Sequence, residues 1–141
     1  MSSPLVVDAS VAVKWLISEA DSGVAEALSA RVLTAPSLVL VECAGALWRR
    51  ARAGDVPMRA LAGKMRVLRL APLRLEPLER HLDHAVELAT ELQHSVHDCV
   101  YLAMALASGA QVVSADRRFV SAVRRRPDLA GSIVLLGETA H

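Results

Sequence analysis

The stretch Leu5-Val6-Val7-Asp8-Ala9-Ser10 places a carboxylate directly after three apolar residues. Because a strand that is apolar at consecutive positions is covered on both faces, this stretch predicts a short buried strand ending at Asp8. Residues 11–15 are mostly apolar and predict a helix that begins near Ser10. Ligands of open parallel sheets collect at the carboxyl ends of the strands, so Asp8 is expected at a binding edge.

The composition predicts one ordinary domain over residues 1–141, with a core of Ala, Leu and Val. The chain is 53% hydrophobic but only 3% aromatic, which argues against a protein that stacks single-stranded bases on aromatic rings. Its 16 basic and 15 acidic residues give a net charge of +1. No global basic field exists, so any contact with nucleic acid must come from local patches.

The cysteines and the lengths of the apolar runs indicate the cellular compartment of the protein. Cys43 and Cys99 lie in apolar sequence and are expected to be buried thiols rather than a disulfide or a zinc site. Residues 1–4 lack the basic region of a signal peptide, and no apolar run is long enough for a transmembrane helix. We therefore expect a soluble cytoplasmic protein.

Short apolar strands alternate with helical patterns along the chain. Strands are predicted at 5–8, 32–35, 73–75, 111–114 and 133–136, separated by helical segments that include 38–52, 58–69, 78–92 and 95–107. Ser37 is expected to cap the first of these helices, and Leu82, Ala85, Val86 and Leu88 to form the inner side of the third. The predicted fold class is α/β, a three-layer α/β/α sandwich with a mostly parallel sheet of about five strands.

Four acidic residues adjoin sequence that should be core: Asp8, Glu42, Asp98 and Asp116. Asp8 and Asp116 repeat one design, in which a short apolar strand leads into an acid and then a helix. Glu42 and Asp98 fall in early turns of the most apolar helices. Most other acids lie on polar faces or in loops, and Glu76, beside Pro77, is left out because its strand is expected to exit elsewhere.

These four carboxylates suggest a metal site. Two carboxylates about 4 Å apart repel each other by roughly 4 kcal/mol at an effective dielectric of 20. A divalent cation between them removes this penalty, and a set of oxygen ligands without histidine or thiolate suits Mg²⁺ or Mn²⁺. Ser10 and Ser114, each two residues from an acid, are candidates to hold metal-bound waters.

Structural explanations of the same acids stay open. Asp8 and Asp116 could be helix caps, and Glu42 could extend out of the core along its stem. Ser95-Val96-His97-Asp98 matches a capping box, which would explain Asp98 without a metal. The alternative is a binding module without catalysis, although ionisable groups in unusual environments cluster at functional sites.

Other enzyme classes could also use these acids. A metal-dependent DNA nuclease or phosphatase could use the same acids, but Ser10 stands where a D-x-D phosphatase motif needs a second acid. No glycine-rich phosphate loop is present. Arg117 and Arg118, beside Asp116, are the best candidates for RNA phosphate contacts, whereas Arg49 and the other arginines are interpreted as solvated helix ends. The histidines, His94 among them, are interpreted as helix-surface residues.

With these residues in view, the chain resembles the PIN-domain ribonucleases, specifically the VapC toxins of toxin–antitoxin pairs. The likeness is carried by Val6-Val7-Asp8-Ala9-Ser10-Val11-Ala12-Val13-Lys14-Trp15, Ala35-Pro36-Ser37-Leu38 with Val41-Glu42, His97-Asp98-Cys99-Val100-Tyr101-Leu102-Ala103, and Ser114-Ala115-Asp116-Arg117-Arg118. It spans nearly the whole chain, with the acids in matching order. Cys43 and Cys99 depart from it, because aliphatic or small residues are expected directly after these acids.

The resemblance implies a five-stranded parallel sheet and endonucleolytic cleavage of structured RNA. It also implies that Asp8, Glu42, Asp98 and Asp116 bind one or two Mg²⁺ or Mn²⁺ ions, that a cognate antitoxin blocks the site, and that the protein is a homodimer. From charge alone, Asp8 and Asp98 are expected to hold the principal metal, with Asp116 and Glu42 completing the cluster. The predicted function is a metal-dependent endoribonuclease toxin of a type II system; the alternative is a PIN-type nuclease in RNA processing or on DNA.

Overall fold

A five-stranded parallel sheet forms the centre of the protein. The computed structural model describes residues 4–138, and the sheet has the order β3-β2-β1-β4-β5. All four strand pairings are parallel. The strands are β1 (Leu5–Val7), β2 (Leu33–Pro36), β3 (Leu73–Glu76), β4 (Gln111–Ser114) and β5 (Ile133–Leu135). The α/β class and the five-stranded sheet predicted from the sequence are confirmed.

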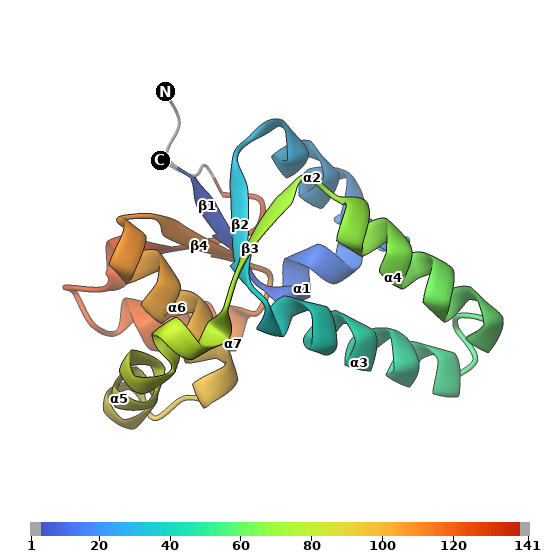
Figure 1. Ribbon diagram of the computed structural model, residues 1–141. Helices are drawn as coiled ribbons and strands as arrows, with labels where there is room; N and C mark the ends of the chain where they lie inside the picture. Colours follow the sequence, from blue (N-terminus) through green and yellow to red (C-terminus); the bar gives the residue numbers. More distant parts are fainter. Residues whose placement is uncertain (1–3, 139–141) are drawn as a thin grey trace.

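Helices cover both faces of this sheet and give the three predicted layers (Figure 1). One side carries α1 (Ala9–Ala12), α2 (Ser22–Ala27), α3 (Leu38–Arg52) and α4 (Leu61–Leu70). The other side carries α5 (Leu82–Leu92), α6 (Val96–Ser108) and α7 (Arg117–Arg124). Short 3₁₀ turns complete the chain at Val13–Trp15, Leu28–Ala30, Met58–Ala60, Leu78–His81 and Ala130–Ser132.

The strand order creates a switch point between β1 and β4. The chain leaves β1 toward β2 on one side, whereas it leaves β4 toward β5 on the other. The connections that follow these neighbouring strands therefore diverge, and a crevice opens at their carboxyl ends, which is where open α/β sheets bind ligands. Asp8 and Asp116 follow these two strands.

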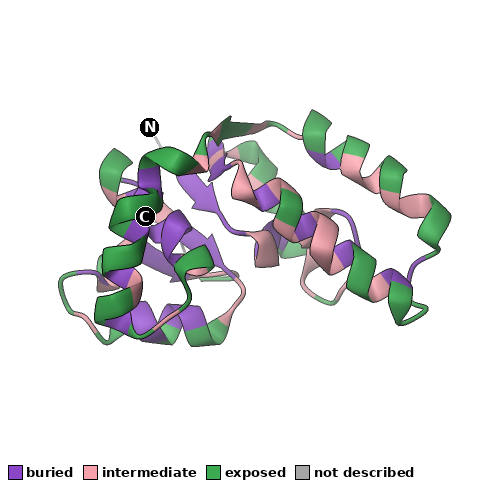
Figure 2. Ribbon diagram, turned by 60° about the horizontal axis from the view of Figure 1, so that its bottom comes forward, coloured by how far each residue is buried: buried purple, intermediate pink, exposed green. Residues whose placement is uncertain are grey.

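The core lies against the central strands and α6. Figure 2 shows the central strands buried and the edge strand β3 largely exposed. Residues 99–105 of α6 are all buried, as its continuous apolar pattern predicts. Cys43 and Cys99 are buried free thiols, which confirms their interpretation as small core residues.

Local signals in the sequence explain most of the helix ends. Gly109 ends α6 with a φ of 68°, a left-handed conformation that glycine adopts without strain. The predicted cap of α3 is wrong, because the side chain of Ser37 makes no cap hydrogen bond. Its backbone is already helical, and its hydroxyl accepts a 3.3 Å hydrogen bond from the amide of Leu78 instead.

The inner face of α5 is also partly different from the prediction. Ala85 and Leu88 are buried, but Leu82 and Val86 are 40% and 48% exposed. The helix is therefore buried along a narrower stripe than its apolar residues suggest. Within residues 4–138, no helix is long and apolar enough to span a membrane.

Candidate active site

All four predicted acids line one pocket of about 290 Å³ at the switch point. Asp8 comes from the end of β1 and Asp116 from the turn after β4, while Glu42 lies on α3 and Asp98 on the first turn of α6. Both helix faces of the sheet thus contribute to the pocket. The sequence places these residues far apart, and the topology brings them together.

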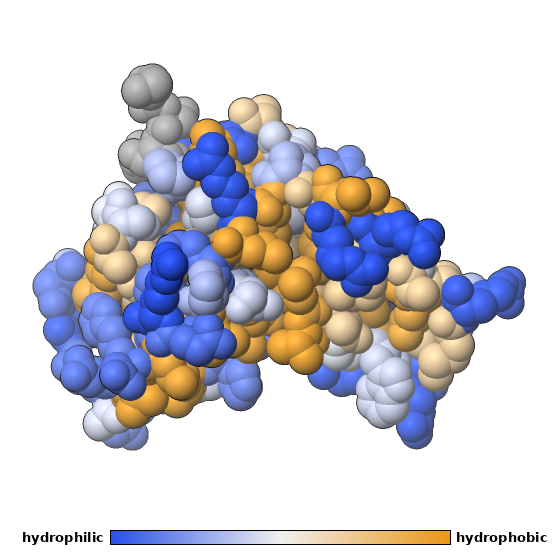
Figure 3. Space-filling model, in the orientation of Figure 1, coloured by the Kyte–Doolittle hydropathy of each residue, from blue (hydrophilic) through white to orange (hydrophobic). Residues whose placement is uncertain are grey.

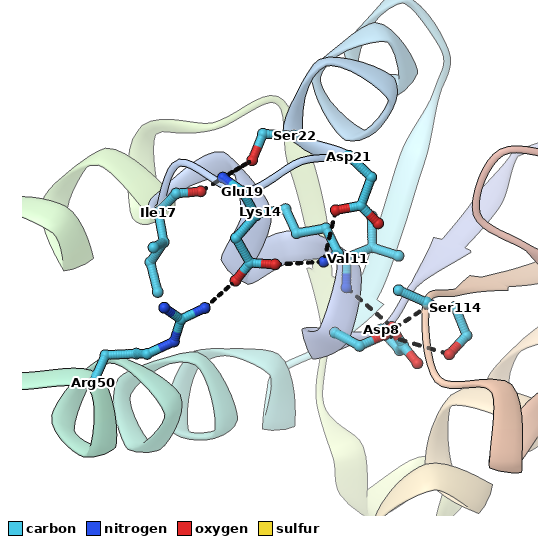
Figure 4. Close-up of polar contacts among 11 residues, drawn as sticks. Asp8, Val11, Lys14, Ile17, Glu19, Asp21, Ser22, Arg50 and Ser114 are labelled. Carbon is cyan, nitrogen blue, oxygen red and sulfur yellow. Dashed lines mark hydrogen bonds and ion pairs between the residues drawn. The ribbon is translucent and has the colours of Figure 1, made fainter. Parts of the chain in front are cut away.

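Two serines join the strand ends that carry Asp8 and Asp116. The Ser10 hydroxyl donates to Asp8 Oδ1 at 2.5 Å and accepts from the amide of Ala115 at 2.9 Å. The Ser114 hydroxyl accepts from the amide of Asp116 at 3.0 Å and lies 3.4 Å from the Ser10 hydroxyl. Figure 4 shows Asp8 between Ser114 and the start of α1. These bonds fix the two aspartates relative to each other.

The capping interpretation is correct for the two aspartates that follow strands, and both aspartates also line the pocket. Asp8 Oδ1 accepts from the amide of Val11 at 3.3 Å. Asp116 Oδ1 accepts from the amides of Arg118 and Phe119 at 3.0 and 3.4 Å. A carboxylate that accepts hydrogen bonds from backbone amides can still line the pocket, so the two roles are compatible.

The other two acids are held by side chains for which the sequence predicts no role in the site. Tyr101, on α6, donates its hydroxyl to Glu42 Oε1 at 2.5 Å. His94 Nε2 lies 2.7 Å from Asp98 Oδ2. His94 was expected on a helix surface, but its side chain is only 17% exposed. The four-residue spacing of His94 and Asp98 across the start of α6 was the available signal.

Each of these carboxylates keeps an oxygen for another ligand. In Glu42, Asp98 and Asp116, the hydrogen bonds found within residues 4–138 all go to one of the two oxygens. The capping box at Asp98 is half formed: the Ser95 hydroxyl accepts from the Asp98 amide at 3.3 Å, while the carboxylate turns to His94. The second oxygens make this an all-oxygen donor set, which suits Mg²⁺ or Mn²⁺.

The carboxylates line the pocket without converging on a single point. Among the described residues, no three His, Cys, Asp or Glu side chains are arranged as a ready set of metal ligands. Each acid is held by its own neighbours instead. The donor chemistry of the pocket fits a divalent metal.

Burial makes the pocket costly for negative charge. It raises the pKa of Asp8 from 3.8 to about 7, against the opposing hydrogen bonds of Ser10 and Ser114 and with a further contribution from Asp98. Burial also raises the pKa of Glu42, although the Tyr101 hydroxyl opposes the change. A bound cation would favour the charged forms of both groups.

One cation of the protein itself lines the pocket. Arg49, seven residues after Glu42 on α3, borders the acid pocket and an adjoining pocket of about 420 Å³ that also contains His97 and Ser95. Its side chain makes no ion pair with the residues that the structure describes. Lys14, by contrast, is bound to Glu19 and Asp21 at 2.6 and 2.9 Å, as Figure 4 shows.

Comparisons with known proteins identify the family of this fold. The PIN domain family model matches residues 5–124. The chain belongs to the PIN domain family. The match includes β1, the switch point and all four acids, and it confirms the resemblance recognised from the sequence. No curated protein is similar enough in sequence to count as a relative.

Solved structures share the PIN fold across most of this chain. PAE2754 from Pyrobaculum aerophilum superposes with a TM-score of 0.69 at 22% identity, covering 96% of this chain and 92% of that one. VapC20 from Mycobacterium tuberculosis, a sarcin–ricin loop cleaving toxin, gives 0.67 at 24% identity, with 84% and 94% covered. VapBC2 from Rickettsia felis, bound to a promoter DNA fragment, gives 0.66 at 18% identity, with 94% and 98% covered. At these identities the likeness establishes the fold.

Proposed function

We propose that the protein is a Mg²⁺- or Mn²⁺-dependent endoribonuclease, the toxin of a type II toxin–antitoxin pair. The observation that carries the proposal is the pocket at the switch point, lined by Asp8, Glu42, Asp98 and Asp116. PIN-domain nucleases generally use divalent metal ions, and a metal of this kind supplies an activated water and neutralises phosphate charge. The oxygen-only donor set supports the same class of metal.

The four acids have different roles in the proposed mechanism. Asp8 and Asp98 hold the principal metal, since Asp8 is the most deeply buried carboxylate and its pKa is raised most strongly by Asp98 among the charged groups around it. Asp116 and Glu42 complete the cluster or orient the attacking water. Ser10 and Ser114 support the aspartates, and their predicted contact with metal-bound water remains a proposal.

The proposed substrate is a phosphodiester bond in tRNA, rRNA or mRNA. Arg49 is the cation best placed to contact a substrate phosphate, because it borders both the acid pocket and the adjoining one. Arg117 and Arg118 are exposed at the first turn of α7, directly after Asp116, and are proposed as secondary phosphate contacts. Lys14 is excluded from this role by its two carboxylate partners.

Two protein partners are proposed, a cognate antitoxin and a second copy of the chain. An apolar groove of about 500 Å³ lies between α3 and α4, with Val41 and Trp48 on its rim 66% and 51% exposed. Figure 3 shows apolar side chains gathered over this side of the molecule. A patch of this kind marks a protein interaction surface. The VapBC2 assembly, which shares the fold, favours an antitoxin as one occupant.

The decisive experiment measures RNA cleavage by purified protein with Mg²⁺, with Mn²⁺, with EDTA, and by the Asp8→Asn variant. Cleavage should require the metal and be lost in the variant, while Glu76→Gln, which removes an acid outside the pocket, should cleave like wild type. Persistent cleavage in EDTA and in Asp8→Asn would refute the proposal. Duplex DNA in the same panel tests the alternative of a DNA-directed PIN nuclease.

The toxin role is tested in cells. Induction should arrest growth, and co-expression of a small antitoxin encoded by an adjacent gene should restore it. Growth that is unaffected by an active enzyme would favour the alternative, a PIN nuclease in RNA processing. We also propose that residues 1–141 form one domain and that the protein is located in the cytoplasm.

A further inference from the structure

The imidazole of His94 contacts two of the elements that carry the acids. His94 lies in the two-residue connection between α5 and the Ser95 cap of α6. Its Nε2 is 2.7 Å from Asp98 Oδ2, and the ring donates to this oxygen in the tautomer that carries its proton on Nε2. The hydrogen bond leaves Oδ1 as the oxygen of Asp98 available to a ligand.

The same ring is held from its other side by α7. It stacks on Phe119 with ring centroids 5.2 Å apart and planes 15° from parallel. Phe119 is fully buried, and its amide donates to Asp116 Oδ1. The ring therefore touches the side chain of Asp98 and the residue that Asp116 caps.

The backbone of His94 is fixed as well. Its amide donates to the carbonyl of Ala89 at 3.2 Å, in the turn that closes α5. The preceding Gln93 has a φ of 55°, a left-handed conformation that a residue other than glycine adopts at a cost. The connection is thus bent so that the ring is delivered to Asp98 from a packed helix end.

A complete capping box would give the Asp98 carboxylate a different partner. In a complete capping box the carboxylate would turn back to the amide of Ser95. In this structure it is bonded to the imidazole. A ligand carboxylate that is held by an outer hydrogen bond keeps its orientation, and loss of such a partner typically weakens metal binding 10- to 100-fold.

We infer that His94 is a positioning residue, which orients Asp98 for metal binding and ties it through Phe119 to the helix capped by Asp116. The inference rests on the proposed function, in which Asp98 is a metal ligand. Phe119 supplies the stacking surface, and the hydrogen bond to Asp98 supplies the orientation.

The test measures Mn²⁺ affinity of metal-free protein by calorimetry. His94→Phe keeps a ring for Phe119 but has no donor, so its Kd for Mn²⁺ should rise by about 10- to 100-fold. His94→Gln keeps a donor at the same reach and should recover most of that loss. His84→Phe is the matched control on the exposed face of α5 and should bind like wild type.

The controls separate this inference from the proposed function. Wild-type affinity in His94→Phe, or equal losses in His94→Phe and His94→Gln, would overturn the positioning role. Equal affinity of wild type and Asp98→Asn would instead overturn Asp98 as a ligand. If His94→Phe does not show the cooperative melting of wild type in EDTA, His94→Ala replaces it as the donor-free variant, and the same loss is required of it.

Discussion

Asp8 makes the stability of the metal-free protein depend on pH in an unusual direction. The carboxylate is almost completely buried, and burial raises its pKa from 3.8 to about 7. Between these two values the folded protein keeps a proton that the unfolded chain has released. The free energy of unfolding therefore falls as pH rises through this window, whereas most carboxylates in proteins contribute in the opposite direction.

The size of the effect follows from the width of the window. About 3 pH units at roughly 1.4 kcal/mol each give a loss of roughly 4 kcal/mol between pH 4 and pH 7. That loss is a large part of the total stability of a domain, which is about 5–15 kcal/mol. Asp8→Asn removes the titration and keeps a residue that caps helices well.

The assay is urea unfolding of both proteins in EDTA at several pH values from 4 to 8. The difference between wild type and Asp8→Asn cancels the other titrating groups, including Glu42, whose pKa is also raised by burial. The variant should become more stable than wild type as pH rises, by an amount approaching 4 kcal/mol above pH 7. Asp83→Asn, at an exposed site on α5, is the control for removal of one acid.

Metal should narrow this difference in stability. Saturation with Mg²⁺ to 100 times its Kd adds about 2.7 kcal/mol to a protein that binds it only when folded. Wild type should gain this stabilisation at pH 8 and Asp8→Asn should not. Parallel pH profiles of the two proteins in EDTA would show that Asp8 is not held at an elevated pKa, and the reasoning from burial would be wrong.

Three further predictions concern other parts of the site. Arg49→Ala should raise the KM for RNA several-fold with little effect on kcat, and cleavage titrations should show a weaker salt dependence than wild type; an unchanged KM would exclude the phosphate contact. Tyr101→Phe removes the hydrogen bond to Glu42, so the pKa of Glu42, measured by NMR titration, should rise further and the free energy of unfolding should fall by about 1 kcal/mol. An unchanged pKa of Glu42 would contradict the hydrogen bond. Burial raises the pKa of Cys43 to about 12 and of Cys99 to about 11. Neither thiol should therefore react with Ellman's reagent at pH 8 until the protein unfolds. Rapid labelling of the native protein would refute their burial.

The strands and the two aspartates that follow them were predictable because their signals are local. Three consecutive apolar residues before Asp8, and the similar run before Asp116, describe a strand covered on both faces. Each acid is also the cap of the next helix, so the same residue marks a strand end and a helix start. The family match then confirmed the fold that this alternation predicts.

The side chains that hold the acids were not predictable in the same way. Tyr101 lies in the continuous apolar run of α6, where an aromatic residue normally indicates only packing, and its partner Glu42 is 59 residues away. Phe119 likewise meets His94 across 25 positions of sequence. Such contacts are set by how helices cross the sheet, and no local pattern encodes them.

The errors on α5 and α3 have the same origin. Leu82 and Val86 follow the helical period of a buried stripe, yet α5 packs mainly against α6 and leaves them exposed. The hydroxyl of Ser37 bonds the Leu78 amide beyond β3 rather than its own helix, because the 3₁₀ turn at Leu78–His81 presents an unpaired donor nearby. Sequence period therefore predicts which face of a helix is apolar, while the neighbouring elements decide how much of that face is covered.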